Sequence, residues 1–300
     1  MKKIRVYHYD AFSKEPNKGN PAGVVLDSDT LTEKEMQDIA KKVGFNETSF
    51  LLKSNVADHR IRYFTPGHEM DLCGHGTMAV IYALVTRGII EFNNELTIET
   101  KAGILPISIH NSNNEIYITM KQKTPEFVEF NGSIDEVASS IGISVEEIDS
   151  TLPTLYGSTG AWNLLLPIKK LASFEKMKPN NQLFPSILNE IPNASIHPFC
   201  LETYDSNADF HARHFSSAFS GTIEDPVTGT ASGIMGAYYA KYINSVVNDV
   251  IDLVVEQGTE IQRDGRVKVK VKKVNSNYEI EITGNAVYVK EMEFHILSRK

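Results

Sequence analysis

The sequence is poor in cysteine. Its 300 residues include only Cys73 and Cys200, which stand far apart and form no metal-type pair. Secreted domains built on disulfides and structural zinc sites both need more cysteines at closer spacing. Such sparse use of cysteine is typical of a reducing cytosol, so we expect a cytoplasmic protein.

Long apolar runs and an excess of positive charge are also missing. The net charge is −8, no basic stripe occurs, and Arg5, His8 and Asp10 interrupt the region where a signal peptide would be apolar. No run approaches the ~18 to 20 apolar residues of a membrane span. We therefore expect a soluble protein with no nucleic-acid or membrane partner.

Sequence motifs for the common cofactors do not occur. There is no Walker loop, no Gly-x-Gly-x-x-Gly after a predicted strand and no Gly-x-Ser-x-Gly. His211 and His214 have a His-x-x-His spacing, but on a predicted strand their rings point to opposite faces, and no third ligand is apparent. The residues therefore predict no metal and no nucleotide, flavin or pyridoxal cofactor.

One pattern occurs twice in the chain. Its first copy is Arg62-Tyr-Phe64, Glu69 and Cys73-Gly74, and its second copy is Arg213-His-Phe215, Glu224 and Thr228-Gly229. In both copies Glu stands four positions before Cys or Thr, and the second copy has a four-residue insertion between Phe and Glu. The repeat predicts two similar halves, each of which presents a helix N-terminus.

Each half is expected to contain a central helix and several strands. Thr77–Thr86 and Ala231–Ala240 are apolar on every face, as buried helices are, and three short alternating segments follow each of them. The segments are Leu96–Thr100, Ile104–His110 and Glu115–Met120, and then Val250–Glu256, Arg266–Lys272 and Tyr278–Thr283. A capping box at Thr32 and Glu35 predicts a further, amphipathic helix over Thr32–Val43.

We expect an α+β fold of two pseudo-symmetric lobes, each a curved mixed or antiparallel sheet wrapped around a central helix. The N-terminal lobe should comprise residues 1–122, and the C-terminal lobe should comprise residues 123–300. In one alternative, the extreme C-terminus completes the N-terminal lobe. The amides that follow Gly74 and those near Gly229 and Thr230 are unpaired at a helix start, and two such starts facing one cleft would suit an anionic substrate. For each start taken alone, a simple tight turn into a helix is the alternative.

Three titratable residues are candidates for proton transfer. At a helix start the dipole disfavours the charged form of His75, and a neutral imidazole suits a relay beside a carboxylate. Asp225 is either its partner or an acidic group near a helix N-terminus. Apolar flanks would raise the pKa of Glu47 toward that of a proton-shuttling acid, but a solvated Glu is the commoner case after a helix. Glu69 and Glu224 are interpreted mainly as structural loop anchors.

Several blocks in the same order resemble the PhzF, or phenazine biosynthesis-like, family. They are Gly19-Asn20-Pro21-Ala22, Asn46-Glu47-Thr48, Leu72-Cys73-Gly74-His75, Glu224-Asp225-Pro226-Val-Thr228-Gly229-Thr230 and Glu256-Gln257-Gly258. The resemblance implies a diaminopimelate epimerase-like fold, no metal, no organic cofactor and a homodimer. It implies an isomerase that, like the family's dihydro-hydroxyanthranilate isomerase, moves a proton on a small carboxylate-bearing substrate.

The resemblance also implies roles for single residues. Glu47 would be the proton shuttle, His75 and Asp225 its polar partners, and Asn20, Gly74, Gly229 and Thr230 substrate-binding residues. The chain departs from the family at Gly76, where Ala is usual, and in Thr230-Ala-Ser232, where Ser-Ala-His is usual. These differences point to a different substrate.

Two other functions compete with the isomerase. An amino-acid or hydroxy-acid racemase would use a base in each half, but the residue that matches Cys73 is Thr228, and a hydroxyl is a poor substitute for a thiolate. A racemase of this fold would thus need Cys73 and some other base. A non-catalytic small-molecule-binding protein on the same fold is the third hypothesis.

Overall fold

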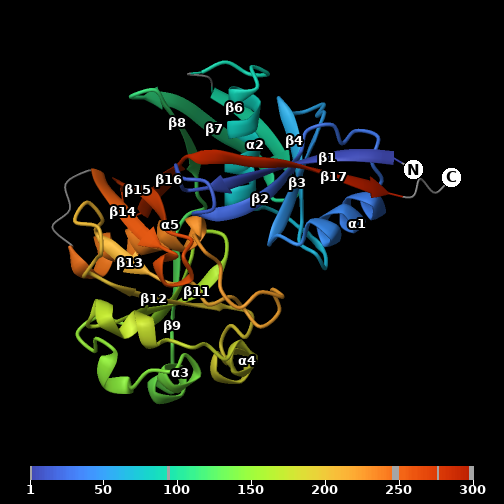
Figure 1. Cartoon of the computed structure of the whole chain (residues 1–300). Helices are drawn as coiled ribbons and strands as arrows, with labels where there is room; N and C mark the ends of the chain where they lie inside the picture. Colours follow the sequence, from blue (N-terminus) through green and yellow to red (C-terminus); the bar gives the residue numbers. More distant parts are fainter. Residues whose placement is uncertain (1, 93–94, 245–249, 276, 297–300) are drawn as a thin grey trace. The chain divides into compact units, whose positions relative to one another are not determined.

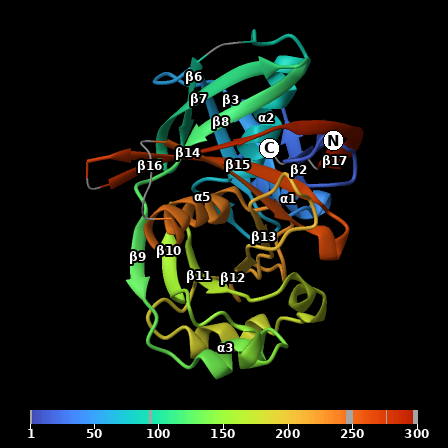
Figure 2. The same cartoon turned by 90° about the vertical axis from the view of Figure 1, so that its left-hand side faces the viewer.

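The computed structural model describes residues 2–92, 95–244, 250–275 and 277–296. Its internal contacts divide the chain into two compact units. The first unit comprises Met1–Lys121 and Thr283–Lys300, and the second unit comprises Gln122–Ile282. Figure 1 and Figure 2 show the elements of each unit from two directions. The domain limits expected from the sequence, 1–122 and 123–300, stay a prediction.

The first unit contains a mixed sheet. Its strands are β1 (Lys2–Ala11), β2 (Asn20–Val25), β3 (Glu47–Leu52), β4 (His59–Phe64), β5 (Glu69–Met70), β6 (Glu95–Thr100), β7 (Gly103–Ser112), β8 (Glu115–Lys121) and β17 (Ala286–Ile296). Hydrogen-bonded neighbours follow the order β17, β1, β2, β3, β4, β6, β7, β8, in which the pairs β2–β3 and β4–β6 are parallel and the others antiparallel. The C-terminal strand β17 thus completes the sheet beside the N-terminal strand β1.

Helix α2 (Gly74–Thr86) is the central helix of this sheet. It contacts β1, β2, β3, β8 and β17, and Figure 1 shows it crossing the strands of its unit. Nearly all of its side chains are buried, from His75 to Val85. The apolar run that predicted this helix has no polar face because strands cover it on several sides.

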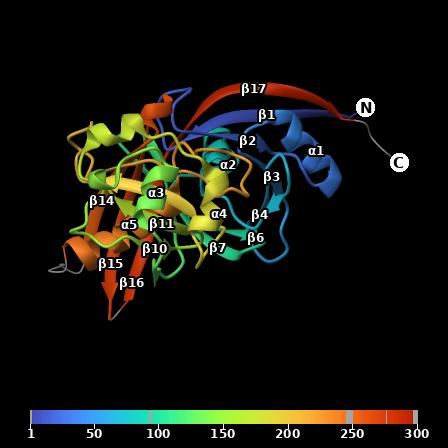
Figure 3. The same cartoon turned by 90° about the horizontal axis from the view of Figure 1, so that it is seen from below.

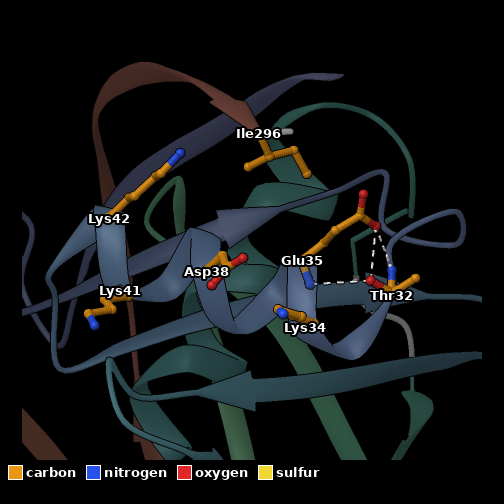
Figure 4. A pocket seen from close by; sticks show the side chains of 7 residues that line it. All are labelled: Thr32, Lys34, Glu35, Asp38, Lys41, Lys42 and Ile296. Carbon is orange, nitrogen blue, oxygen red and sulfur yellow. Dashed lines mark hydrogen bonds between the residues drawn. The ribbon is translucent and has the colours of Figure 1, made fainter. Parts of the chain in front are cut away.

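Helix α1 (Glu33–Val43) covers the same sheet from outside and begins with the predicted capping box. The Thr32 hydroxyl accepts from the Glu35 amide, and the Glu35 carboxylate accepts from the Thr32 amide, as Figure 4 shows.

A hollow of about 430 Å³ lies over helix α1. It is lined by Thr32, Lys34, Glu35, Asp38, Lys41, Lys42 and Ile296. No residue predicted to serve the reaction lines this hollow, so it is not the candidate site.

The second unit contains another mixed sheet. Its strands are β9 (Glu126–Glu129), β10 (Leu155–Ser158), β11 (Trp162–Pro167), β12 (Ser195–Cys200), β13 (Phe210–Ala212), β14 (Val250–Gln257) and β15 (Gly265–Val274), and β16 (Asn277–Gly284) follows them in the chain. From β9 to β15 each strand pairs with the next, in parallel for β11–β12 and β13–β14 and antiparallel for the others.

Helix α5 (Gly229–Tyr238) is the counterpart of α2 in the second unit. It packs on β15 and β10 and buries almost every side chain, and a π-helical turn, η4 (Tyr239–Ile243), extends it. Glycines allow close packing, because a Cβ at Gly236 would lie 2.6 Å from Val269 Cγ1.

Helices α3 (Ile134–Ser140) and α4 (Phe184–Ile187) face the viewer in Figure 3 and share a core with β10, β11 and β12. Short 3₁₀ turns complete the unit: η1 (Val145–Glu147), η2 (Leu171–Lys176), η3 (Asn181–Leu183) and η5 (Thr259–Ile261).

The α+β class expected from the sequence is confirmed, with a sheet and an apolar helix in each unit. Every strand predicted after the two central helices occurs, with its ends moved by a few residues. None of the helices in the described part of the chain combines the length and the apolar composition that crossing a membrane requires.

Candidate active site

The repeated pattern forms the same structure in both units. Arg62 binds both carboxylate oxygens of Glu69 at 2.6 and 2.7 Å, and Arg213 binds both of Glu224 at 2.9 and 2.6 Å. The guanidinium groups also lie over Phe64 and Phe215, at 5.1 and 4.8 Å from the ring centroids. These pairs tie each loop to a neighbouring segment just before the central helix begins, so the interpretation of Glu69 and Glu224 as loop anchors is confirmed.

Helix α2 begins after Cys73, which caps it. The Cys73 sulfur accepts a hydrogen bond from the Gly76 amide at 3.3 Å. A Cβ at Gly76 would lie 2.4 Å from Ser49 Oγ and 3.0 Å from Cys73 Sγ, so a larger residue there would displace these two side chains. A Cβ at Gly74, in contrast, would meet no atom within 4 Å. The departure from the usual alanine at Gly76 therefore has a local steric cause.

Glu47 and His75 meet at this helix start. Glu47 is the first residue of β3, and its Oε2 lies 3.0 Å from Nε2 of His75 in the first turn of α2. The side chains are 14% and 8% exposed. Oε2 is buried and has no hydrogen bond of good geometry, because the contact with Nε2 is close but poorly aligned. The structure thus places Glu47 against an imidazole rather than in solvent.

Asn20 and Cys73 surround the same imidazole. Asn20, the first residue of β2, is buried and has its amide group 3.2 Å from His75 Nδ1. The Cys73 sulfur lies 3.5 Å from Nδ1 and 3.7 Å from Nε2. The predicted residues Glu47, His75, Asn20 and Gly74 therefore lie together in the first unit. They belong to three elements, β2, β3 and α2.

The prediction that the charged form of His75 is disfavoured is wrong. Burial opposes the charged form, but the adjacent Cys73 and Glu47 outweigh it and raise the pKa of His75 well above its ordinary value. We attribute the rise to the Glu47 carboxylate, because burial also raises the pKa of the Cys73 thiol and keeps it neutral. The sequence argument considered only the helix dipole, whereas the neighbouring strand contributes a carboxylate.

Asp225 lies in the second unit, three residues before Thr228, the N-cap residue of α5. Its Oδ2 accepts from the Thr228 hydroxyl at 2.6 Å, and its backbone carbonyl accepts from the Gln257 side-chain amide at 2.7 Å. The same Gln257 accepts from the Thr228 amide at 3.1 Å and is 1% exposed. A Cβ on Gly258, whose φ is +92°, would lie 2.8 Å from the Pro226 carbonyl oxygen. This packing holds the Asp225 loop beside the start of α5.

Gly229 and Thr230 form the first turn of α5. Gly229 is buried, and the Thr230 carbonyl accepts from the Thr159 hydroxyl at 3.0 Å. Thr228 differs from Cys73, because its hydroxyl binds Asp225 instead of capping the helix. Asp225, Gly229 and Thr230 thus belong to the second unit, and their joint use with Glu47 and His75 stays a prediction.

Sequence reasoning missed Gln257 and the buried pair His197 and His214. Gln257 lies 29 positions after Thr228, and only the Glu256-Gln257-Gly258 block indicated that it mattered. Nδ1 of His214 lies 3.3 Å from Nδ1 of His197, and burial lowers the pKa of both rings. His211 instead contacts Glu256 and Glu260, at 2.9 and 2.8 Å. The two rings of the His-x-x-His spacing therefore have different partners.

Within the described residues, one group of side chains has donor atoms close enough to hold a metal. The donor atoms of Glu47, Cys73 and His75 all lie within 4.8 Å of one another. Two of them lie at the start of α2 and Glu47 begins β3, whereas His211 and His214 do not belong to the group. The geometry at α2 can therefore hold a proton between a carboxylate and an imidazole, and it also offers three metal donors.

Comparisons with known proteins identify the family of this chain. The family model of the phenazine biosynthesis-like proteins, PhzC-PhzF, matches residues 9–292. The uncharacterized isomerase YfhB of Bacillus subtilis is 49% identical over 96% of this chain and 97% of its own length. The crystal structure of a PhzF-family protein from Bacillus anthracis has a TM-score of 0.97 and 62% identity, over 99% of this chain and 100% of that one.

A more distant relative has a named reaction. It is a trans-2,3-dihydro-3-hydroxyanthranilate isomerase of Pseudomonas chlororaphis, 27% identical over 94% of this chain and 97% of its own length. The likeness to the PhzF-family crystal structure confirms the diaminopimelate epimerase-like fold expected from the sequence, and both curated relatives are named isomerases. The chain belongs to the phenazine biosynthesis-like PhzC-PhzF family and is an isomerase.

Proposed function

We propose that this isomerase moves a proton on a small carboxylate-bearing substrate by general acid/base catalysis, with Glu47 as the carrier and with no cofactor. The contact of 3.0 Å between Glu47 Oε2 and His75 Nε2 is the observation that carries the proposal. A largely buried carboxylate beside a titratable ring is the arrangement that proton transfer to and from carbon needs. The named Pseudomonas relative supports a substrate of the dihydro-hydroxyanthranilate kind.

The reaction requires one residue to accept a proton and return it. The Glu47 carboxylate removes a proton from an activated carbon, and the bonding electrons move into the adjacent unsaturated system. The resulting carboxylic acid of Glu47 then protonates another carbon of that system, so that substrate and product have the same composition. His75 in its protonated form donates toward Glu47 or toward the negative charge that develops on the substrate. With its side-chain amide turned so that the oxygen accepts, Asn20 holds the Nδ1–H of the protonated ring.

Gly74 is the proposed binding residue of the first unit. Since no atom within 4 Å would meet a side chain there, the packing of the chain does not explain the glycine. Close approach of a substrate carboxylate to the first amides of α2 does explain it. By the resemblance, Asn20, Gly229 and Thr230 contribute to binding and Asp225 to proton transfer. A homodimer in the cytoplasm is part of the same proposal, and sedimentation analysis tests the dimer.

The racemase that would rely on Cys73 is disfavoured. Burial raises the pKa of the Cys73 thiol, which opposes the thiolate that a racemase base must be. At the matching position of the second unit, the Thr228 hydroxyl donates to Asp225 and offers no base. Neither the Cys73 thiol nor the Thr228 hydroxyl is therefore placed to act as the base of a racemase.

Solvent deuterium exchange tests the proposal. The protein is incubated in D₂O with dihydroaromatic carboxylic acids and amino acids, and deuterium in the recovered compounds is measured by mass spectrometry. We expect deuterium in a dihydroaromatic acid with the wild type and none with Glu47→Gln. Exchange that survives Glu47→Gln would remove Glu47 from the mechanism. Exchange limited to the α-carbon of amino acids would favour the racemase, and no exchange with any compound would favour a binding protein.

A further inference from the structure

Cys73 has no part in the proposed proton transfer beyond capping α2, yet its sulfur lies beside both reacting side chains. Sulfur, nitrogen and oxygen donors from Cys73, His75 and Glu47 all fall within 4.8 Å of one another. The three side chains are largely buried, so few waters compete for their donor atoms. The arrangement therefore resembles a mixed-donor metal site more than a chance surface cluster.

The spacing of the donors fits tetrahedral zinc. Zn²⁺ binds thiolate at ~2.3 Å and imidazole nitrogen or carboxylate oxygen at ~2.0 to 2.2 Å, so neighbouring ligand atoms lie roughly 3.4 to 3.6 Å apart. In the structure, Cys73 Sγ lies 3.7 Å from His75 Nε2, and this nitrogen lies 3.0 Å from Glu47 Oε2. The sulfur also lies 3.5 Å from Nδ1 of His75, so the imidazole must turn to aim Nε2 at an ion that Cys73 and Glu47 share. The fourth ligand position of such an ion would be open.

Neighbouring groups support the same ligands. The Asn20 amide contacts Nδ1 of His75 at 3.2 Å, and with its oxygen turned to this nitrogen it leaves Nε2 free to bind a metal. The Gly76 amide donates to the Cys73 sulfur at 3.3 Å and would keep this contact with a metal-bound thiolate. Both contacts are of the kind that orients the ligands of established metal sites.

We propose that Glu47, Cys73 and His75 bind one Zn²⁺ ion, which inhibits the enzyme. The metal displaces the thiol proton of Cys73 and the Nε2 proton of His75, because both side chains bind a metal in their deprotonated forms. Binding is independent of the proposed function, whereas inhibition rests on it, because the ion occupies the oxygen of Glu47 and the nitrogen of His75 that the reaction uses. Zinc here is an inhibitor and not a cofactor.

Cobalt is the optical probe for this site. The full-length protein is freed of metal with a chelator and titrated with Co²⁺, which absorbs strongly in the near ultraviolet when a thiolate binds it. We expect one Co²⁺ per chain with this absorption, its displacement by equimolar Zn²⁺, and no displacement by Mg²⁺, which prefers oxygen ligands. Absence of the thiolate absorption would overturn the proposal.

Variants identify the ligands. Cys73→Ser should remove the thiolate absorption, whereas the matched control Cys200→Ser should keep it, because Cys200 lies in the second unit. Asn20→Ala should weaken Zn²⁺ binding by about 10- to 100-fold. Absorption that persists in Cys73→Ser, or that disappears in Cys200→Ser, contradicts the assignment. If circular dichroism shows that Cys73→Ser is unfolded, the Co²⁺ affinities of His75→Gln and Glu47→Gln are measured instead. Unchanged Co²⁺ affinity in both variants would overturn the proposed site.

Turnover measurements test the inhibition separately. Zn²⁺ should abolish turnover of the wild type over the concentration range in which it displaces Co²⁺. Full activity at saturating Zn²⁺ would refute the inhibition. Co²⁺ binding to a protein without isomerase activity would leave the metal site standing and refute the proposed function instead.

Discussion

At the scale of single residues, Glu47 and Cys73 distinguish two chemistries. Glu47→Gln should lower kcat by about 10² to 10⁴-fold, the usual contribution of a general acid or base. Cys73→Ser should lower it by no more than about tenfold, because the Cys73 thiol has a raised pKa and serves as a helix cap. Steady-state kinetics of both variants check this. The opposite order of effects would establish the thiol as the base.

Gly74 and Gly76 lie in the same turn of α2 but have different constraints. Gly76→Ala should lower the free energy of unfolding by about 1 to 3 kcal/mol, since the new methyl group would lie 2.4 Å from Ser49 Oγ. The double variant Ser49→Ala/Gly76→Ala should recover most of this loss. Urea denaturation measures both values. Additive losses in the double variant would mean that Ser49 is not the obstacle.

Gly74→Ala is the companion to that experiment. It should leave the free energy of unfolding unchanged or raise it by up to about 1 kcal/mol, because alanine favours a helix and meets no neighbour. It should raise KM, because the methyl group obstructs the substrate carboxylate. An unchanged KM in the stable variant would exclude Gly74 from binding.

At the scale of elements, β13, β14 and the turn η5 are joined by a buried charged network. His211 of β13 contacts Glu256 of β14 at 2.9 Å and Glu260 of η5 at 2.8 Å, while Arg266 lies 3.5 Å from Glu256 and the Tyr204 ring packs on His211. Burial opposes the charge on His211, but the two carboxylates prevail and raise its pKa. The same network lowers the pKa of Glu256.

The network makes a prediction about stability and pH. Folding raises the pKa of His211. The contribution of His211 to the free energy of unfolding is therefore complete below its unfolded pKa of about 6.5, and it is lost as the pH rises through the folded pKa. The contribution of Glu256 is lost only at acid pH, below the unfolded pKa of about 4.3. The free energy of unfolding should therefore fall as the pH rises above about 6.5, and less steeply in His211→Gln.

Urea denaturation across this pH range is the measurement. The slopes are compared rather than the absolute values, because His211→Gln also removes a buried contact. His295→Gln is the control, since this side chain is 54% exposed on β17 and should keep the wild-type slope. Equal slopes in the wild type and His211→Gln would show that His211 carries no linked proton.

At the scale of the whole molecule, the proposed function uses residues of both units. The family resemblance implies that Asp225 serves the same chemistry as Glu47, and in the structure the Thr228 hydroxyl donates to its carboxylate. Asp225→Asn should then lower kcat by about 10²-fold or more. The exposed Asp252→Asn in the same unit should have no effect. Equal activity of the two variants would confine catalysis to the first unit.

Much of the architecture followed from local patterns. The capping box of α1, the two apolar helices and the Arg–Glu pairs are encoded by residues close together in the chain, where helix and strand periodicity operates. The strands β10, β11 and β12 are not predicted, because nearly all of their side chains are buried and no alternation of apolar and polar residues marks them.

The repeat, the apolar helices and the resemblance of Glu47, His75 and Asp225 to family positions were determined by the sequence itself, since each is a matter of residue order and spacing. Tertiary structure alone decided that Glu47 faces His75, that the imidazole favours its charged form, that Gly76 makes room for Ser49, and that Gln257 positions Thr228. All four depend on contacts between separate elements. Burial and Coulomb energies act through space, and no local pattern encodes them.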